Sequence, residues 1–289
     1  MTDLTIPSLF VVNNKVALVT GGGAGIGYMI ADTLVQNGAK VYIASRKEKQ
    51  LQQVRELLDR RGPGRCQYIV ADLGSKAGCD ALSDSFKQRE SKLHVLVNNS
   101  GVTWAAPMDQ FPEKQGWDRV IALNVKSIFY SESLLDFSSS SNFFDRTTNQ
   151  VTTNLTELLT KDSTAPDPGR VVNISSVGSL SAHAETVWSY STSKAAVNHL
   201  TSTMAVSLAP KFITVNAILP GFYPSRATAY VYDKHAAELN KSHPMGRVGS
   251  PGDMAGLFLF FVSPAGAHVT GAQVETDGGT RISGIKLKL

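Results

Sequence analysis

The stretch KVALVTGGGAGIG, residues 15–27, decides the fold of this chain. Its first part is an apolar run with strong β propensity, which predicts a strand at Lys15–Thr20. The glycine-rich part leads into an apolar-periodic stretch, which predicts a helix from Ile26 to Leu34. Glycines let a backbone approach a pyrophosphate closely, and the N-terminus of a helix presents free N–H groups to it. The order of strand, glycine-rich turn and helix therefore favours a dinucleotide-binding unit over a flexible surface turn.

Strands and helices alternate along the rest of the chain. Further strands are expected at Lys40–Ala44, Gln67–Val70, His94–Asn98, Arg170–Ser175, Ile213–Leu219 and Ala272–Thr276. The clearest helices between them are expected at Gln50–Arg61, Trp117–Leu135 and Ser189–Ala209. This alternation predicts an α/β fold, a Rossmann-type doubly wound parallel sheet of about seven strands with helices on both faces. Ligands of such a sheet bind outside the carboxyl ends of the strands.

A Tyr-x-x-x-Lys pair, Tyr190 and Lys194, lies on the last of the long helices. Positions i and i+4 share a helix face, so the pair directs a phenol and an ammonium into the same space. The ammonium is expected to lower the pKa of the phenol from its usual value of about 10. Tyr190 would then act as a proton donor and acceptor for a carbonyl/alcohol couple. Exposed helices also carry such pairs by chance, so the accompanying motifs decide between the two interpretations.

The end of the second strand carries Ser45, Arg46 and Lys47, and no acid appears before Glu48. An acidic residue about twenty positions after the glycine motif would bind the ribose 2′-hydroxyl of NAD. A serine and two cations instead suit a 2′-phosphate, which a guanidinium binds well. The alternative is a solvated helix start, but the helix dipole disfavours cations there. The charges therefore favour NADP(H) over NAD(H).

A series of ordered motifs resembles the short-chain dehydrogenase/reductase family from about Lys15 to Gly279. The glycine motif of the family matches Thr20, Gly21, Gly25 and Gly27, and its adenine-side Asp matches Asp72 beside Leu73. Its Asn-Asn-Ala-Gly matches Asn98, Asn99, Ser100 and Gly101, with Ser in place of Ala. Its helix Asn, Ser, Tyr and Lys match Asn124, Ser176, Tyr190 and Lys194. Its Pro-Gly and its late Asp-Gly-Gly match Pro220, Gly221, Asp277, Gly278 and Gly279.

The resemblance implies a role for each matched position. The implied catalytic residues are Asn124, Ser176, Tyr190 and Lys194. With the charge pattern, it implies a cofactor site formed by Gly21, Gly25, Ile26, Gly27, Ser45, Arg46, Lys47, Asp72, Leu73, Asn99, Gly101, Tyr190, Lys194, Pro220, Gly221, Phe222 and Ser225. Ser176 is preferred to Ser175 because Val177 and Gly178 follow it as in the family pattern. Ser176 would polarise a carbonyl and Tyr190 would protonate it. Lys194 would bind the nicotinamide ribose, and Asn124 would hold a water that links Lys194 to solvent.

These residues predict NADPH-dependent reduction of a ketone, such as a keto-lipid, a polyketide-like compound or a similar small apolar carbonyl, to a secondary alcohol. The alternatives are an NADP-dependent alcohol dehydrogenase that works oxidatively and a non-catalytic NADP(H)-binding regulator. Aromatic residues near the expected pocket suggest a roomy apolar site, or equally ordinary packing and subunit contact. They are Trp104, Trp188, Phe222, Tyr223, Tyr230 and Tyr232.

The chain is expected to form a single domain, residues 1–289, with a substrate loop near 222–247. Between Asn124 and Ser176 it is longer than relatives commonly are, which indicates an irregular polar insertion near 137–168. The insertion is expected beyond the far end of the helix that bears Asn124, opposite the active site. It would be a surface loop or a partner contact, with helix propensity returning at Val151–Leu159.

Composition narrows the function class. The 289 residues are 42% hydrophobic with a net charge of +4, and no run of cations suggests nucleic-acid binding. Cys66 and Cys79 form no disulfide framework, and the histidines show no metal-ligand spacing, so no metal is expected. No apolar stretch reaches membrane-span length, and no secretory signal is evident, which favours a cytoplasmic location. The ending Leu287-Lys288-Leu289 matches a peroxisomal signal poorly. The resemblance implies a homotetramer or homodimer that pairs through the helices bearing Asn124 and Tyr190.

Overall fold

The computed structural model describes residues 3–129, 151–181, 186–225 and 229–283. Within these residues, one sheet has the strand order β3-β2-β1-β4-β5-β6-β7, and every neighbouring pair is parallel. Its strands are β1 (Val16–Thr20), β2 (Lys40–Ser45), β3 (Arg65–Val70), β4 (Val95–Asn98), β5 (Gly169–Ile174), β6 (Ile213–Pro220) and β7 (Gln273–Thr276). Each of these strands overlaps an expected one, and the predicted fold class is confirmed.

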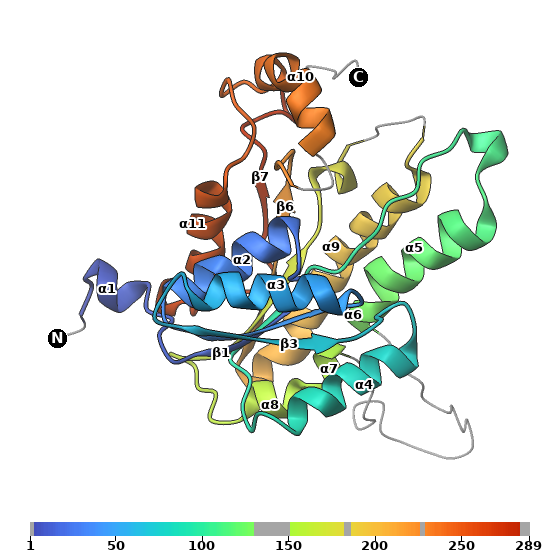
Figure 1. The fold of residues 1–289 in the computed structure, drawn as a ribbon. Coiled ribbons are helices and arrows are strands. Elements are labelled where there is room, and N and C mark those ends of the chain that lie inside the picture. Colours follow the sequence, from blue (N-terminus) through green and yellow to red (C-terminus); the bar gives the residue numbers. More distant parts are fainter. Residues whose placement is uncertain (1–2, 130–150, 182–185, 226–228, 284–289) are drawn as a thin grey trace.

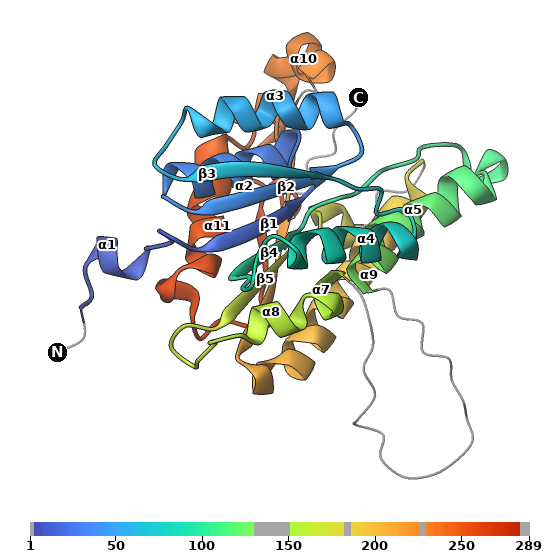
Figure 2. The same ribbon diagram turned by 60° about the horizontal axis from the view of Figure 1, so that its bottom comes forward.

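Helices cover both faces of the sheet, as a comparison of Figures 1 and 2 shows. Helices α2, α3 and α11 pack on one face, and α4, α6, α8 and α9 pack on the other. Helix α7 joins the second layer through the hydrogen bond between Thr152 and Asn98. The helices of the described chain are α1 (Ile6–Leu9), α2 (Gly25–Gln36), α3 (Glu48–Asp59), α4 (Lys76–Lys87), α5 (Arg119–Ile121), α6 (Ser127–Phe129), α7 (Val151–Asn154), α8 (Thr156–Thr160), α9 (Trp188–Leu208), α10 (Ala229–Ser242) and α11 (Pro251–Val262).

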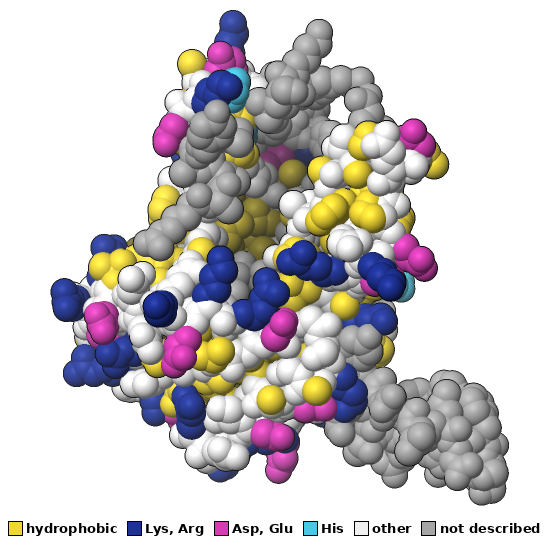
Figure 3. Space-filling model, turned by 45° about the vertical axis from the view of Figure 1, so that its right-hand side comes forward, with side chains coloured by type: hydrophobic (Ala, Val, Ile, Leu, Met, Phe, Trp, Pro, Cys, Tyr) yellow, Lys and Arg dark blue, Asp and Glu magenta, His cyan; other side chains and the backbone are white. Residues whose placement is uncertain are grey.

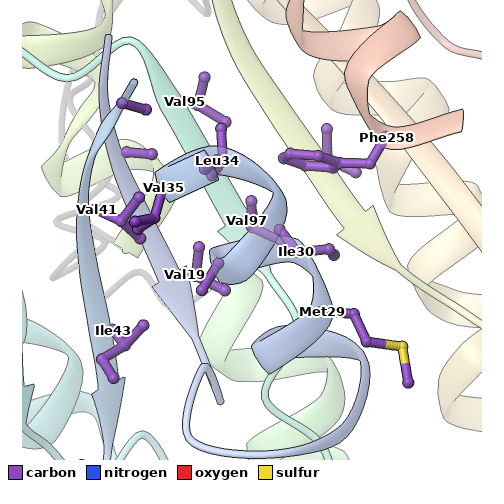
Figure 4. Packing of buried hydrophobic residues seen from close by; sticks show 14 of the residues in the cluster. Val19, Met29, Ile30, Leu34, Val35, Val41, Ile43, Val95, Val97 and Phe258 are labelled. Atoms are coloured by element: carbon purple, nitrogen blue, oxygen red, sulfur yellow. The ribbon is translucent and has the colours of Figure 1, made fainter. Parts of the chain in front are cut away.

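The buried side chains form two clusters, one on each face of the sheet. Alternate residues of β1 enter different clusters, with Val19 on the face of α2 and Leu18 on the opposite face. Figure 4 shows Ile30 and Leu34 of α2 among the side chains of the strands, with Phe258 of α11 close by. Each fully buried side chain of this size contributes roughly 1.5–3 kcal/mol. Packing on both faces therefore holds the carboxyl ends of the strands in place relative to one another.

The register of the sheet aligns the ends that matter for ligand binding. Val19 pairs with Ile43 of β2 and with Val97 of β4. Asn98 at the end of β4 pairs with Asn173 of β5. The strand order reverses between β1 and β4, which is where open α/β sheets form their binding crevice.

The segment between β4 and β5 differs from its expected form. Residues 113–129 are helical, with π turns at Glu113–Asp118 and Ala122–Lys126, and the remainder of the helix expected at Trp117–Leu135 lies outside the described residues. After residues 130–150, which are also outside the described part, the chain forms α7 and α8, where helix propensity is expected. The helix propensity expected at Val151–Leu159 is confirmed, so the segment expected to be irregular near 137–168 is mostly helical over residues 151–160. Leu155, which directly precedes α8, and Leu159 within α8 are fully buried because they pack into the hydrophobic cluster on that face of the sheet.

The expected location of this segment also needs correction. Thr152 of α7 is buried, and its Oγ1 accepts a hydrogen bond of 3.2 Å from Nδ2 of Asn98 at the carboxyl end of β4. The main-chain oxygen of Leu158 in α8 accepts a bond from Leu93, just before β4. Helices α7 and α8 thus run back along β4 from its carboxyl end, and α7 does not lie opposite the active site. Residues 137–150 lie outside the described part of the chain.

Candidate active site

A cavity of about 640 Å³ opens at the carboxyl ends of the strands. Figure 3 shows a hollow with hydrophobic side chains on its floor in the face of the molecule below α10. The cavity is lined by residues from the turns after β1, β4, β5 and β6 and from the first turns of α9. It brings together Ser176, Tyr190 and Lys194 with Ile26, Pro220, Gly221, Phe222 and Ser225.

Ser176 and Tyr190 lie next to one another in the wall of this cavity. Ser176 follows β5 directly, and its Oγ accepts a bond of 3.1 Å from the Gly178 N–H. Tyr190 lies in the first turn of α9, and a side-chain hydrogen bond joins it to Ser176. Burial raises the pKa of the Tyr190 phenol and outweighs the lowering by the Ser176 bond. Tyr190 therefore keeps its proton at neutral pH.

Lys194 lies one helical turn after Tyr190 and is 5% exposed. Its Nζ donates a bond of 2.7 Å to the main-chain oxygen of Ile174, and lies 5.8 Å from the centre of the Tyr190 ring. Burial lowers the pKa of Lys194 to about 8. The expectation that Tyr190 has a pKa below its usual value is wrong for this structure, because burial of the phenol raises it. The ammonium bonds the end of β5, while burial of the phenol dominates.

Asn124 is fully buried within the π turn Ala122–Lys126, and its side chain bonds the loop after β4. Its Oδ1 accepts from the Val102 N–H at 2.8 Å, and its Nδ2 donates to the Val102 carbonyl at 3.0 Å. Nδ2 also donates to Oγ of Ser193, at 2.9 Å. A side chain at Gly101 would place its Cβ 3.3 Å from Oδ1 of Asn124 and 3.6 Å from Nζ of Lys194. Glycine therefore keeps the space between the amide and the ammonium open.

The turn after β1 forms a cradle at the N-terminus of α2. Gly21 and Gly25 have φ of 66° and 54°, the left-handed region that glycine adopts readily. A Cβ at Gly27 would lie 2.5 Å from the carbonyl oxygen of Gly21, so only glycine allows this close packing of turn and helix. No side chain caps α2, which leaves its first N–H groups directed at the cradle. Oγ1 of Thr20 accepts from the N–H of Asn99 at 2.9 Å and joins the cradle to the loop after β4.

A second cavity of about 330 Å³ extends from this cradle across the ends of β2 and β3. It shares Gly25, Asn99, Gly101, Val102 and Ser225 with the first cavity, so the two are continuous. Its far end is lined by Ser45, Arg46, Asp72 and Leu73, together with Gly21 nearer the turn. The Arg46 guanidinium lies 3.9 Å from the Asp72 carboxylate, and both side chains are more than half exposed.

The sequence predicted most of this lining. Of the expected cofactor residues, Gly27 and Lys47 line neither cavity, because Gly27 packs under the turn and Lys47 precedes α3. Sequence reasoning missed Val102, Thr103, Val187 and Ser191, which line the first cavity without belonging to the matched motifs.

Some of the aromatic residues expected near the pocket line the cavity, whereas others are packed elsewhere in the protein. Phe222 and Tyr223 line the first cavity, and Tyr232 stacks on Phe222 with ring centres 6.3 Å apart. Trp104 and Trp188 were expected near the pocket mouth but do not line the cavity, and their indole N–H groups are buried without a partner among the described residues. The side chain of Tyr230 lies outside the described part.

Two findings bear on other kinds of site. Across the described ranges, no three His, Cys, Asp or Glu side chains are grouped closely enough to hold a metal ion. No helix in the part of the chain that the structure describes is long and apolar enough to span a bilayer.

The fold and this constellation define a dinucleotide-dependent oxidoreductase. The family pattern described as short chain dehydrogenase matches residues 15–136, and that described as Enoyl-(Acyl carrier protein) reductase matches residues 144–281. The chain is 37% identical over 272 residues to the rhamnolipids biosynthesis 3-oxoacyl-[acyl-carrier-protein] reductase of Pseudomonas aeruginosa, covering 93% of this chain and 97% of that protein. It is 30% identical to the short-chain dehydrogenase/reductase PhomF of Diaporthe leptostromiformis, covering 96% of this chain and 94% of that protein.

A solved structure of similar shape is the Pseudomonas aeruginosa RhlG/NADP active-site complex. It superposes with a TM-score of 0.83 at 36% identity, covering 95% of this chain and 99% of that one. The chain therefore belongs to the short-chain dehydrogenase/reductase family of oxidoreductases, as its motifs predict.

Proposed function

We propose that the protein reduces a ketone to a secondary alcohol with NADPH. The observation that carries this proposal is the meeting of Ser176, Tyr190 and Lys194 in a cavity that continues into the glycine cradle of α2. The relatives named as 3-oxoacyl reductases support a substrate whose ketone belongs to an acyl chain. Val102, Val187 and Phe222 give the cavity an apolar lining suited to such a chain.

The residues present fit NADP(H). The uncapped N-terminus of α2 and the close approach at Gly27 would receive the pyrophosphate. Ser45 and Arg46 would hold the 2′-phosphate at the far end of the second cavity, and Asp72 would lie beside the adenine. The named NADP complex among similar structures supports this assignment. The bound cofactor supplies the hydride.

The side chains of this site then handle the proton and the developing negative charge. The Ser176 hydroxyl donates a hydrogen bond to the substrate oxygen and polarises the carbonyl. Tyr190, which keeps its proton at neutral pH, donates it to the same oxygen as the alcohol forms. The Lys194 ammonium beside the Tyr190 ring stabilises the phenolate that remains. We assign to Asn124 the role of holding the loop after β4 and a water beside Lys194, in the space that Gly101 leaves open.

The same site would support two other functions, which an assay distinguishes. An oxidative alcohol dehydrogenase would need Tyr190 deprotonated, which the raised pKa of Tyr190 disfavours at neutral pH. A regulator that only senses NADPH would need no proton donor. The test is NADPH oxidation with a panel of 3-oxoacyl thioesters, 3-oxoacyl esters and simple ketones. Turnover with the 3-oxoacyl compounds supports the proposal, whereas NADPH binding without turnover on any carbonyl supports the regulator.

We also propose that the protein acts as a homodimer or homotetramer in the cytoplasm. Val197 and Met204 of α9 are buried in the core of their own chain, so they do not form the contact between subunits. Val206 on the same helix is 78% exposed and Phe129 of α6 is 49% exposed. The outward faces of these helices are therefore the surfaces on which a second copy would pack.

A further inference from the structure

The turn that carries Ser176 is held by hydrogen bonds that lead to α9. Ser176 opens a short 3-10 turn, Val177–Ser179. Its main-chain oxygen accepts from the Ser179 N–H at 3.0 Å and from Oγ of Ser179 at 2.5 Å. Oγ of Ser179 in turn lies 2.7 Å from Nδ2 of Asn198. A relay therefore runs from Asn198 through Ser179 to the backbone of Ser176.

The direction of each bond follows from the chemistry of the groups. A carbonyl oxygen only accepts, so the single hydroxyl hydrogen of Ser179 is committed to the oxygen of Ser176. Oγ of Ser179 must then accept from Asn198, which requires the amide nitrogen, and not the amide oxygen, to face it. An aspartate at position 198 has the same shape but no donor, and its oxygen would compete for that hydrogen.

Asn198 lies on the helix face that bears the proposed proton donor. Tyr190, Lys194 and Asn198 follow at intervals of four residues on α9. Asn198 is only 6% exposed, and its own main-chain oxygen accepts a bond of 3.0 Å from Nε2 of Gln273 on β7. One buried residue thus ties the Ser176 turn to the helix of Tyr190 and to strand β7. Neither Ser179 nor Asn198 lines the active-site cavity.

We propose that Asn198 and Ser179 are positioning residues that fix the Ser176 hydroxyl relative to Tyr190. This inference rests on the proposed function, in which that hydroxyl binds the substrate oxygen. A displacement of about 1 Å in a group that orients a substrate can cost about a hundred-fold in rate. Loss of the relay therefore lowers kcat through Ser176 while leaving the binding of NADPH at the cradle of α2 unchanged.

The test introduces Asn198→Ala both into the wild-type protein and into Ser176→Ala. Single-turnover rates with excess enzyme, NADPH and a 3-oxoacyl ester are compared, beside NADPH affinity and the thermal midpoint. In the wild type, Asn198→Ala should lower the rate about ten-fold or more, and Asn198→Asp at least as much. In the Ser176→Ala background, the same substitution should change the rate less than about two-fold, because the hydroxyl that it positions is absent.

Thr203→Ala is the matched control. Thr203 is an exposed residue of α9, and its hydroxyl donates a hydrogen bond to the main-chain oxygen of His199 in the same helix. A merely structural role would make Asn198→Ala cost the same in both backgrounds, and that result overturns the inference. An unchanged rate in the wild-type background overturns it too. If Asn198→Ala lowers the thermal midpoint so far that it does not fold, Ser179→Ala on the partly exposed turn is put through the same comparison.

Failure of the proposed function would be recognised separately. It would appear as a Ser176→Ala variant that turns over as fast as the wild type. Failure of this inference appears where Ser176→Ala is slow, but Asn198→Ala either leaves the wild-type rate unchanged or lowers the rate equally with and without the Ser176 hydroxyl.

Discussion

The Arg46→Ala substitution should narrow the preference of the protein for NADPH over NADH. Arg46 lies at the far end of the second cavity, where the 2′-phosphate is proposed to bind. A hydrogen bond to a charged group contributes roughly 1.5–3 kcal/mol. The Arg46 side chain is 52% exposed, so solvent screening places the effect near the lower end. The KM for NADPH should therefore rise about ten-fold, which corresponds to about 1.4 kcal/mol.

The assay measures initial rates at saturating ketone while either cofactor is varied. The KM for NADH should change little, because NADH carries no 2′-phosphate for Arg46 to bind. Lys47→Ala is the matched control, because Lys47 is a neighbouring cation that does not line the cavity. Its effect should stay below about two-fold, as for an exposed surface charge. Equal KM values for the two cofactors in the wild type, or equal changes in both after Arg46→Ala, would refute the reasoning.

Three further predictions follow from the structure. The rate of reduction should fall as pH rises through about 8, because Lys194 loses its charge there while Tyr190 keeps its proton. A kcat/KM profile that stays flat through that pH range would contradict this prediction. In a urea titration, Leu159→Ala should lower the free energy of unfolding by about 2–5 kcal/mol, because Leu159 is fully buried. The control Leu57→Ala, at a site that is 46% exposed, should lower it by less than about 0.5 kcal/mol. Light scattering should give two or four times the chain mass of 31.0 kDa, and Val206→Asp should shift it toward that of one chain; a wild-type peak at one chain mass would exclude the proposed assembly.

The sequence predicted the fold closely because the spacing of apolar residues and the position of turn-forming glycines are local signals. A few residues are enough to recognise the strand at Lys15–Thr20, the glycine-rich turn after it and the helix that follows. The seven strands and their parallel order then follow from alternation and from the preference for short right-handed connections. Helix propensity at Val151–Leu159 likewise predicted α7 and α8, but the polar composition of the surrounding segment did not show that they pack along β4.

Sequence spacing predicted that Ser176, Tyr190 and Lys194 lie together, but it could not predict the electrostatics around them. Tyr190 and Lys194 were paired correctly by their spacing, yet the sign of the pKa shift at Tyr190 depends on burial by the folded chain. Spacing also could not show that the Lys194 ammonium bonds the carbonyl of Ile174. The link from Asn198 to Ser179 joins segments that only the tertiary fold brings together.

The most direct test of the central claim is the rate of NADPH-dependent alcohol formation by Tyr190→Phe. Tyr68→Phe is the matched control, because the Tyr68 hydroxyl bonds Gln52 and Glu48 at the surface. The product alcohol and the NADPH consumed are measured together, beside NADPH affinity. We expect Tyr190→Phe to bind NADPH as the wild type does and to form alcohol at least about a hundred-fold more slowly, as for loss of a general acid. Alcohol formation by Tyr190→Phe at the rate of Tyr68→Phe would contradict the account.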